Sequence, residues 1–149
     1  MTKISPSGLI IPKEYEWMYS KKNKKIKNAT VTIYNGITFR SKLEAECAKI
    51  LDEEGINYQY EPFKIILLPS FKYLGKTLRE WHYSPDFVVF NNIIIEVKGF
   101  PNDVWGYKKK MILKYIVDHN YIYEFYEVKN KTQLRTLIKE LKAKNNENT

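Results

Sequence analysis

Three charged side chains stand close together in an otherwise apolar stretch of the sequence. Asp86 follows Pro85 before one apolar run, and Glu96 and Lys98 end the next run. Residues two apart on a strand project from the same face, so we expect Glu96 and Lys98 side by side and Val97 in the opposite layer. A carboxylate and an ammonium at the end of a buried strand are costly unless partners or a metal ion satisfy them.

This set of groups suits a hard divalent cation. Mg²⁺ prefers oxygen ligands and takes few of them from protein, and Asp86, Glu96 and the backbone carbonyl of Val97 would supply such oxygens. Lys98 would then lie beside a metal-bound water, where it could orient or help deprotonate that water, or stabilise charge on a phosphate. A cation that neutralises a phosphate and activates the attacking water is typical of phosphodiester hydrolysis.

The metal-site hypothesis requires an irregular connection between two strands. Residues 87–90 and 93–97 are predicted strands, and their near-continuous apolar character indicates burial on both faces. A strict two-residue turn between them would pair Phe87 with Glu96 and put Asp86 on the other face of the sheet. For Asp86 and Glu96 to share a metal ion, the loop must therefore have an odd length or a strand must contain a bulge.

A third carboxylate comes from an earlier helix, which is predicted from Ser41 to Gly55. Its apolar stripe consists of Leu43, Cys47, Ile50 and Leu51. Glu44 lies on the flank of this stripe and can reach the sheet, whereas Glu46 points to solvent. Ser41 and Glu44 also match a capping box, in which Glu44 accepts a hydrogen bond from the amide of Ser41. Helix capping and metal binding therefore compete for the Glu44 carboxylate.

The remaining elements complete an α/β layer fold with a mixed central sheet flanked by helices. Extended segments are predicted at residues 31–34, 58–68, 71–73, 77–81 and 121–128, and further helices at residues 102–119 and 131–144. The turn at residues 74–76 makes a hairpin of its two flanking segments.

Composition limits the class of protein. The 149 residues are 44% hydrophobic, which suits one folded domain, and a single cysteine with two histidines argues against disulfides and against a Cys- or His-rich metal site. No apolar run approaches the roughly 18–20 residues of a membrane span, and Met1–Pro6 lack the apolar stretch of a signal peptide. We expect a cytoplasmic protein with no membrane partner. Its net charge of +8 favours a polyanion such as nucleic acid.

The basic residues fall into two regions. We predict a basic N-terminal arm over residues 1–36 and a folded domain over residues 37–149. The arm either lies along phosphates or is a solvated terminus, and its cluster contains Lys21, Lys22, Lys24 and Lys25. In the domain, Arg40 is the candidate for touching a scissile phosphate. Lys108 and Lys109 on the second helix are either phosphate contacts or solvated surface.

Together these motifs resemble the PD-(D/E)XK nuclease superfamily, and within it the phage endonuclease I type, whose members resolve branched DNA such as Holliday junctions. The similarity covers about residues 37–118 and rests on Gly36-x-x-Phe39-Arg40-Ser41-x-Leu43-Glu44, Tyr83-Ser84-Pro85-Asp86-Phe87 and Glu96-Val97-Lys98-Gly99. The resemblance implies a restriction-endonuclease-like fold, Mg²⁺ or Mn²⁺ as cofactor, a homodimer and, for a phage-encoded chain, the host cytoplasm. It implies that the catalytic residues are Glu44, Asp86, Glu96 and Lys98.

We therefore predict a metal-dependent endonuclease that hydrolyses DNA. Asp86 and Glu96 bind the cation, Glu44 completes or supports the metal site, and Lys98 positions or activates water. The segment Pro69–Trp81 departs from the compact branched-DNA enzymes, so branched DNA, linear duplex DNA and RNA all remain open as substrates. The alternative in a different class is a non-catalytic nucleic-acid-binding module on the same fold, which would have no need of a buried carboxylate next to a lysine.

Overall fold

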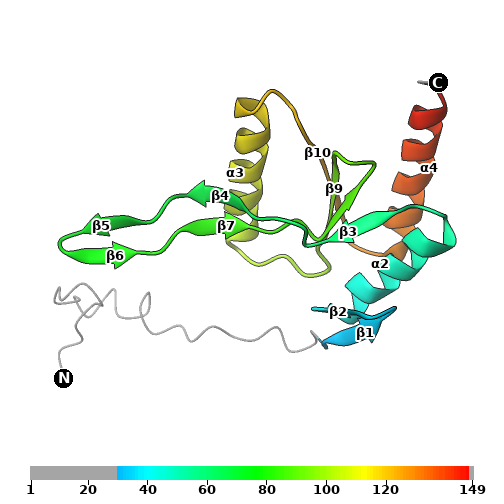
Figure 1. Ribbon diagram of the computed structural model, residues 1–149, viewed down its shortest axis with the longest axis horizontal. Coiled ribbons are helices and arrows are strands. Elements are labelled where there is room, and N and C mark those ends of the chain that lie inside the picture. The colour runs from blue at the N-terminus through cyan, green and yellow to red at the C-terminus, as the bar shows by residue number, and fades with distance from the viewer. Residues whose placement is uncertain (1–29, 148–149) are drawn as a thin grey trace.

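A mixed four-stranded sheet forms the centre of the protein in the computed structural model, which describes residues 30–147 (Figure 1). The strand order is β10–β9–β8–β3. Strands β3 (Tyr58–Tyr60), β8 (Phe87–Val89) and β9 (Ile93–Val97) pair antiparallel in that order, and β10 (Glu124–Val128) pairs parallel to β9. The parallel pair is connected through a helix, as a parallel connection requires.

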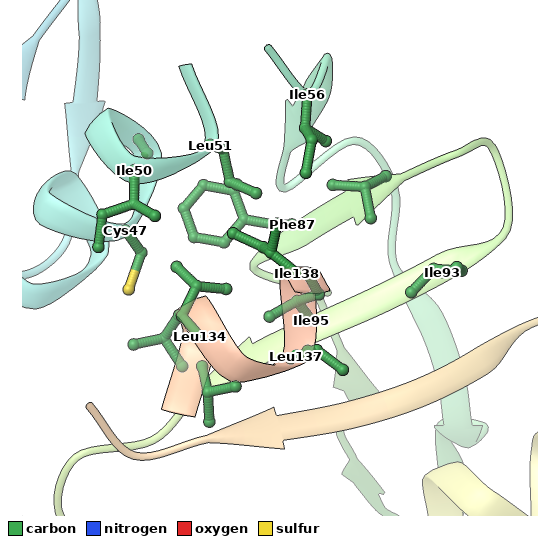
Figure 2. Packing of buried hydrophobic residues seen from close by; sticks show 14 of the residues in the cluster. Cys47, Ile50, Leu51, Ile56, Phe87, Ile93, Ile95, Leu134, Leu137 and Ile138 are labelled. Carbon is green, nitrogen blue, oxygen red and sulfur yellow. The ribbon is translucent and has the colours of Figure 1, made fainter. Parts of the chain in front are cut away.

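Helices cover both faces of this sheet. Helices α2 (Lys42–Glu53) and α4 (Lys131–Glu147) pack on one face, and α3 (Trp105–Asp118) packs on the other. Figure 2 shows side chains of α2 and α4 gathered around Phe87 and Ile95, which point into that layer. Val88 and Ile94 alternate with them and pack in the α3 layer. The prediction of an α/β fold with a mixed central sheet flanked by helices is confirmed.

The register between β8 and β9 meets the requirement of the metal-site hypothesis. Phe87 lies opposite Ile95 and Val89 opposite Ile93, so the connecting loop has three residues. Phe90 and Asn91 take φ values of 50° and 68°, left-handed conformations that allow this tight reversal. Of the two predicted alternatives, an odd loop length or a bulge, the structure has the odd loop length, and Asp86 therefore faces the same layer as Glu96.

Local hydrogen bonds and turns set where the helices and strands begin. Ser41 caps α2, because its Oγ accepts a hydrogen bond from the amide of Glu44 at 3.1 Å. The second predicted helix begins at Trp105 instead of residue 102, since the Asn102 side chain accepts from the Trp105 amide at 3.0 Å. Strand β10 begins at Glu124 and not at residue 121, because positive φ values at Asn120 and Tyr121 form a turn after α3. Helix α4 extends past residue 144 to Glu147.

The predicted hairpin between the first helix and β8 forms a long ribbon (Figure 1). Strand β4 (Ile65–Leu68) pairs with β7 (Trp81–Tyr83), and farther out β5 (Phe71–Tyr73) pairs with β6 (Lys76–Leu78). The two-residue turn at Leu74 and Gly75 has φ values of 48° and 79°, as a tight hairpin with right-handed twist requires. The predicted extended segments at residues 58–68 and 77–81 are thus each divided into two strands.

A small hairpin precedes α2. Strands β1 (Thr32–Tyr34) and β2 (Ile37–Phe39) pair antiparallel, so this hairpin crosses the boundary predicted between residues 36 and 37. Fully buried Phe39 packs its ring against Tyr60 and Phe87 and so joins the hairpin to the core. The arm lysines 21, 22, 24 and 25 lie outside the described residues. Within residues 30–147, no helix is both long enough and apolar enough to cross a membrane.

Candidate active site

A cavity of about 470 Å³ lies where the start of α2, the end of β7, β8, the end of β9 and the start of α3 meet. Its lining includes most of the residues singled out from the sequence: Arg40, Glu44, Asp86, Glu96, Val97, Lys98 and Lys108. Lys109 is not part of the lining. The fold therefore brings segments that are far apart in the sequence to one place.

Asp86, directly before β8, and Glu96, near the end of β9, form a buried carboxyl pair, with 7% and 6% of their surface exposed. The Asp86 Oδ2 accepts a hydrogen bond from the backbone N–H of Val97 at 2.8 Å. The Glu96 Oε2 accepts one from the Tyr83 hydroxyl at 2.5 Å. Each carboxyl group thus has one oxygen held by the protein, and this fixes its orientation without using its full capacity to accept hydrogen bonds or bind a cation.

Burial disfavours the charged forms of both groups. It raises the pKa of Asp86 well above the usual range, and the charges of Glu96 and Glu44 raise it further. Burial raises the pKa of Glu96 from 4.5 to about 7, although the Tyr83 hydroxyl and the Lys98 ammonium act in the opposite direction. Without a cation, the pair therefore retains a proton near neutral pH. Two carboxyl groups in this state gain strongly from a positive charge between them.

Lys98 directly follows the last residue of β9, and its charge lowers the pKa of Glu96. Its Nζ is 4.7 Å from the ring centre of Trp105, in a cation–π contact. The Trp105 indole in turn donates to Glu127 at 3.0 Å, and Lys109 forms an ion pair with Glu127 at 3.0 Å. The Lys98 amine is thus held by a supported ring, while Lys109 is engaged within the protein beside the cavity.

Glu44 combines a capping contact with a place near the carboxyl pair. Its Oε2 accepts from the Tyr60 hydroxyl at 2.8 Å and from the backbone N–H of Arg40 at 3.1 Å. The capping box is therefore shifted by one residue, because the amide that Glu44 binds belongs to Arg40 and not to Ser41. Glu44 is 8% exposed, and its charge raises the pKa of both Asp86 and Glu96.

The oxygen atoms in the cavity can be compared with the ligands that a divalent cation requires. Among residues 30–147, no group of three or more His, Cys, Asp or Glu side chains converges closely enough to hold a metal ion. Mg²⁺ commonly uses only one or two carboxylates and completes its shell with water and substrate phosphate. Asp86 and Glu96, with Val97 also lining the cavity, satisfy that smaller requirement. Glu44 stands beside this pair and is occupied by Tyr60 and Arg40.

Two basic side chains give the cavity a positive rim. Arg40 lines it and forms an ion pair with Glu61 at 2.8 Å, while 73% of its side chain stays exposed. Lys108 lines it from α3, with Nζ 5.9 Å from the Tyr83 ring centre and 6.0 Å from that of Trp81. Partial burial lowers the pKa of Lys108. Both are placed to meet an anionic substrate entering the cavity.

Three aromatic residues support the site that sequence analysis did not assign: Tyr60, Tyr83 and Trp105. Burial, with the neighbouring Glu96 charge, raises the pKa of Tyr83 far above its ordinary value, so the hydroxyl keeps its proton and acts as a donor. The position of Tyr83 three residues before Asp86 was the available signal. No sequence spacing points to Tyr60 or Trp105, because their contacts depend on the register of β3 and on the packing of α3 against the sheet.

Comparison with known proteins gives the family of the chain. The profile of the family described as phage endonuclease I matches residues 17–134. Endodeoxyribonuclease 1 of Enterobacteria phage T3 is 38% identical over 65 residues, which is 43% of this chain and 38% of that protein. Endonuclease I of Escherichia phage T7 is 36% identical over 62 residues, 41% of this chain and 36% of that protein.

These alignments cover little more than a third of the two relatives' length. No solved structure matches the chain significantly. The family profile, by contrast, spans most of the chain and includes the whole cavity lining. The resemblance inferred from the three motifs is thereby confirmed, and the chain belongs to the phage endonuclease I family.

Proposed function

We propose that this protein is a metal-dependent endonuclease that hydrolyses phosphodiester bonds of DNA. The observation that carries the proposal is the buried Asp86–Glu96 pair beside Lys98 in a cavity with a basic rim. Membership of the phage endonuclease I family supports it, as do the names of the two relatives, an endodeoxyribonuclease and an endonuclease. A purely structural ion pair would not need an open cavity of this size.

In this proposal Asp86, Glu96 and the Val97 carbonyl hold Mg²⁺ or Mn²⁺, and the Glu44 carboxylate supports the pair from the side. The bound cation supplies charge neutralisation at the phosphate and a lowered pKa for the attacking water. Lys98, held over Trp105, orients that water or stabilises charge on the phosphate. Arg40 and Lys108 bind the phosphates on either side of the cut without reading sequence.

The finer features of the proposal are the substrate and the assembly. Family resemblance favours branched DNA such as a Holliday junction, and a homodimer whose two sites cut two strands. Linear duplex DNA and RNA are the competing substrates. Faster cleavage of a four-way junction than of the matched linear duplex would support a resolvase, and equal rates would remove that assignment while leaving the nuclease. Light scattering with and without junction measures the number of subunits.

The decisive experiment is cleavage of supercoiled plasmid and of a four-way junction with Mg²⁺, Mn²⁺ or EDTA. We expect cleavage by the wild type with either cation, none with EDTA, and none by Glu96→Ala with either cation. Glu46→Ala is the matched control, because Glu46 lies outside the cavity lining and is partly exposed beside Lys131 at 3.7 Å. Binding without cleavage by the wild type under every condition would instead favour the non-catalytic module.

A further inference from the structure

The outer ribbon, formed by Phe71–Leu78, stands away from the body of the protein (Figure 1). Every residue from Pro69 to Arg79 is exposed. Within residues 30–147, β5 and β6 make their main contacts with each other. The chain continues from the outer ribbon into β7, whose residues His82 and Tyr83 line the cavity. The outer ribbon is therefore an extension of one wall of the candidate active site.

Cationic and aromatic side chains share the surface of this ribbon. Lys72, Lys76 and Arg79 carry positive charge, and in the described part of the chain none of them forms an ion pair. Tyr73 lies opposite Lys76 and is 56% exposed. Lys72 projects from the other face, opposite Thr77. A narrow ribbon with cations on both faces suits a polyanion such as the phosphate backbone of DNA.

Building on the proposed nuclease function, we propose that the outer ribbon binds a duplex arm of the DNA substrate away from the cut. A two-stranded ribbon is narrow enough for a major groove that is about 12 Å wide. Tyr83 follows Leu74 by nine positions, so at about 3.3 Å per residue the tip of the outer ribbon reaches about 30 Å from the cavity. At about 3.4 Å per base pair, this places the contact about nine base pairs from the cut.

A second copy of this chain is the other conceivable occupant, because Phe71, Leu74 and Leu78 are also exposed. Pairing two ribbons, however, brings the three cations of each copy against like charges, which is destabilising. The nearby carboxylate, Glu80, is already paired with Lys64 at 2.6 Å and offers no compensation. Charge complementarity therefore favours DNA over self-association.

The test measures DNA affinity against salt concentration for the full-length protein, with EDTA to prevent cleavage. The ribbon variant combines Lys72→Gln, Lys76→Gln and Arg79→Gln. The matched control combines Lys49→Gln, Arg135→Gln and Lys139→Gln, which remove the same charge from exposed positions of α2 and α4 across the sheet. Each is measured on junctions with arms of about 6 and about 25 base pairs, one shorter and one longer than the reach estimated from strand geometry.

We expect the slope of log affinity against log salt to fall by about 2–3 for the ribbon variant on long arms, since each phosphate contact contributes about 0.9. The dissociation constant on long arms should rise at least tenfold, while short arms and the control variant should show wild-type values. Wild-type slopes and affinities for the ribbon variant on long arms would overturn the proposal. So would unchanged DNA affinity together with altered self-association in light scattering.

The two proposals fail separately. Absence of cleavage by the wild type with Mg²⁺ and Mn²⁺ would refute the nuclease, but the salt slopes would still decide whether the ribbon binds DNA. Normal cleavage with an unaltered ribbon-variant slope would refute only the ribbon. Folding is not a confounding factor for the ribbon variant, because the side chains of Lys72, Lys76 and Arg79 are exposed and form no ion pair in the described part of the chain.

Discussion

Replacing Glu96 with glutamine should stabilise the metal-free protein in alkaline solution. The folded state holds Glu96 with a pKa of about 7, whereas the carboxyl group of the unfolded chain titrates at its ordinary 4.5. The folded state thus binds more protons between these values, and its stability falls as the pH rises through this window. Above pH 7 this difference lowers the free energy of unfolding by about 3 kcal/mol, because each pH unit between the two pKa values contributes roughly 1.4 kcal/mol. Glutamine is uncharged and still accepts the Tyr83 hydrogen bond, so Glu96→Gln removes the penalty.

The assay is urea unfolding of wild type and Glu96→Gln in EDTA at pH 4.5 and pH 8.5. We expect nearly equal free energies of unfolding at pH 4.5, where Glu96 is protonated in the folded wild type. At pH 8.5 we expect the variant to be more stable by about 3 kcal/mol, or by more because the loss of the Glu96 charge also lowers the pKa of Asp86. Equal stabilities at pH 8.5, or a less stable variant, would refute the claim that burial raises the pKa of Glu96 in the folded protein.

Adding Mg²⁺ extends the same experiment to the proposed cofactor. A cation that binds only the folded state stabilises it by about 2.7 kcal/mol at a concentration a hundred times its dissociation constant. The wild type should gain this stability at pH 8.5, where the carboxyl pair is ionised, and lose it at pH 4.5. Glu96→Gln should respond weakly at either pH. A stabilisation that is equal for both proteins would place the cation elsewhere.

Further substitutions examine the groups around the carboxyl pair. Tyr83→Phe removes the hydroxyl that lowers the pKa of Glu96. We therefore expect the cleavage rate to rise at higher pH than in the wild type, and the free energy of unfolding in alkaline solution to fall by about 1–2 kcal/mol. An unchanged pH profile would contradict the role of that hydrogen bond. Lys98→Met should abolish cleavage while leaving Mg²⁺-induced stabilisation measurable, and residual activity near the wild-type rate would exclude Lys98 from the reaction. Glu44→Gln should slow cleavage at least tenfold and Glu46→Gln, on the same helix, should leave the rate unchanged; similar rates for both variants would reduce Glu44 to a helix cap.

Much of the fold was predictable because its signals are local. The stripe of α2, the Ser41 cap and the apolar strands β8 and β9 each follow from periodicity within one segment. The requirement for an odd loop or a bulge between β8 and β9 also followed from strand alternation, and the three-residue loop meets it. Helix and strand ends were less accurate, since local turns such as the one held by the Asn102 side chain decide them.

The contacts that tune the site were not predictable from spacing. Tyr83 meets Glu96 across strands that belong to different sheets, and Trp105 meets Lys98 from a helix on the α3 face. Such contacts depend on three-dimensional packing, which one sequence does not reveal. The Glu44 carboxylate illustrates the same limit. The sequence correctly predicted that it accepts a hydrogen bond from a backbone amide at the start of α2, but the donor is Arg40 and not Ser41, and the Tyr60 hydroxyl donates to the same oxygen.

The three-residue loop between β8 and β9 also restricts how this protein can change in length. Removing or adding one residue there would shift the register of β9 against β8 by one residue. The side chains of β9 that now face α3 would then face α2 and α4, and the reverse. Glu96 would enter the apolar layer beneath α4, and a valine or isoleucine would replace it opposite Asp86. Changes of one residue are therefore expected to abolish both the cavity chemistry and the packing of the core. Longer insertions should be tolerated far better at the tip of the outer ribbon, where no buried register depends on them.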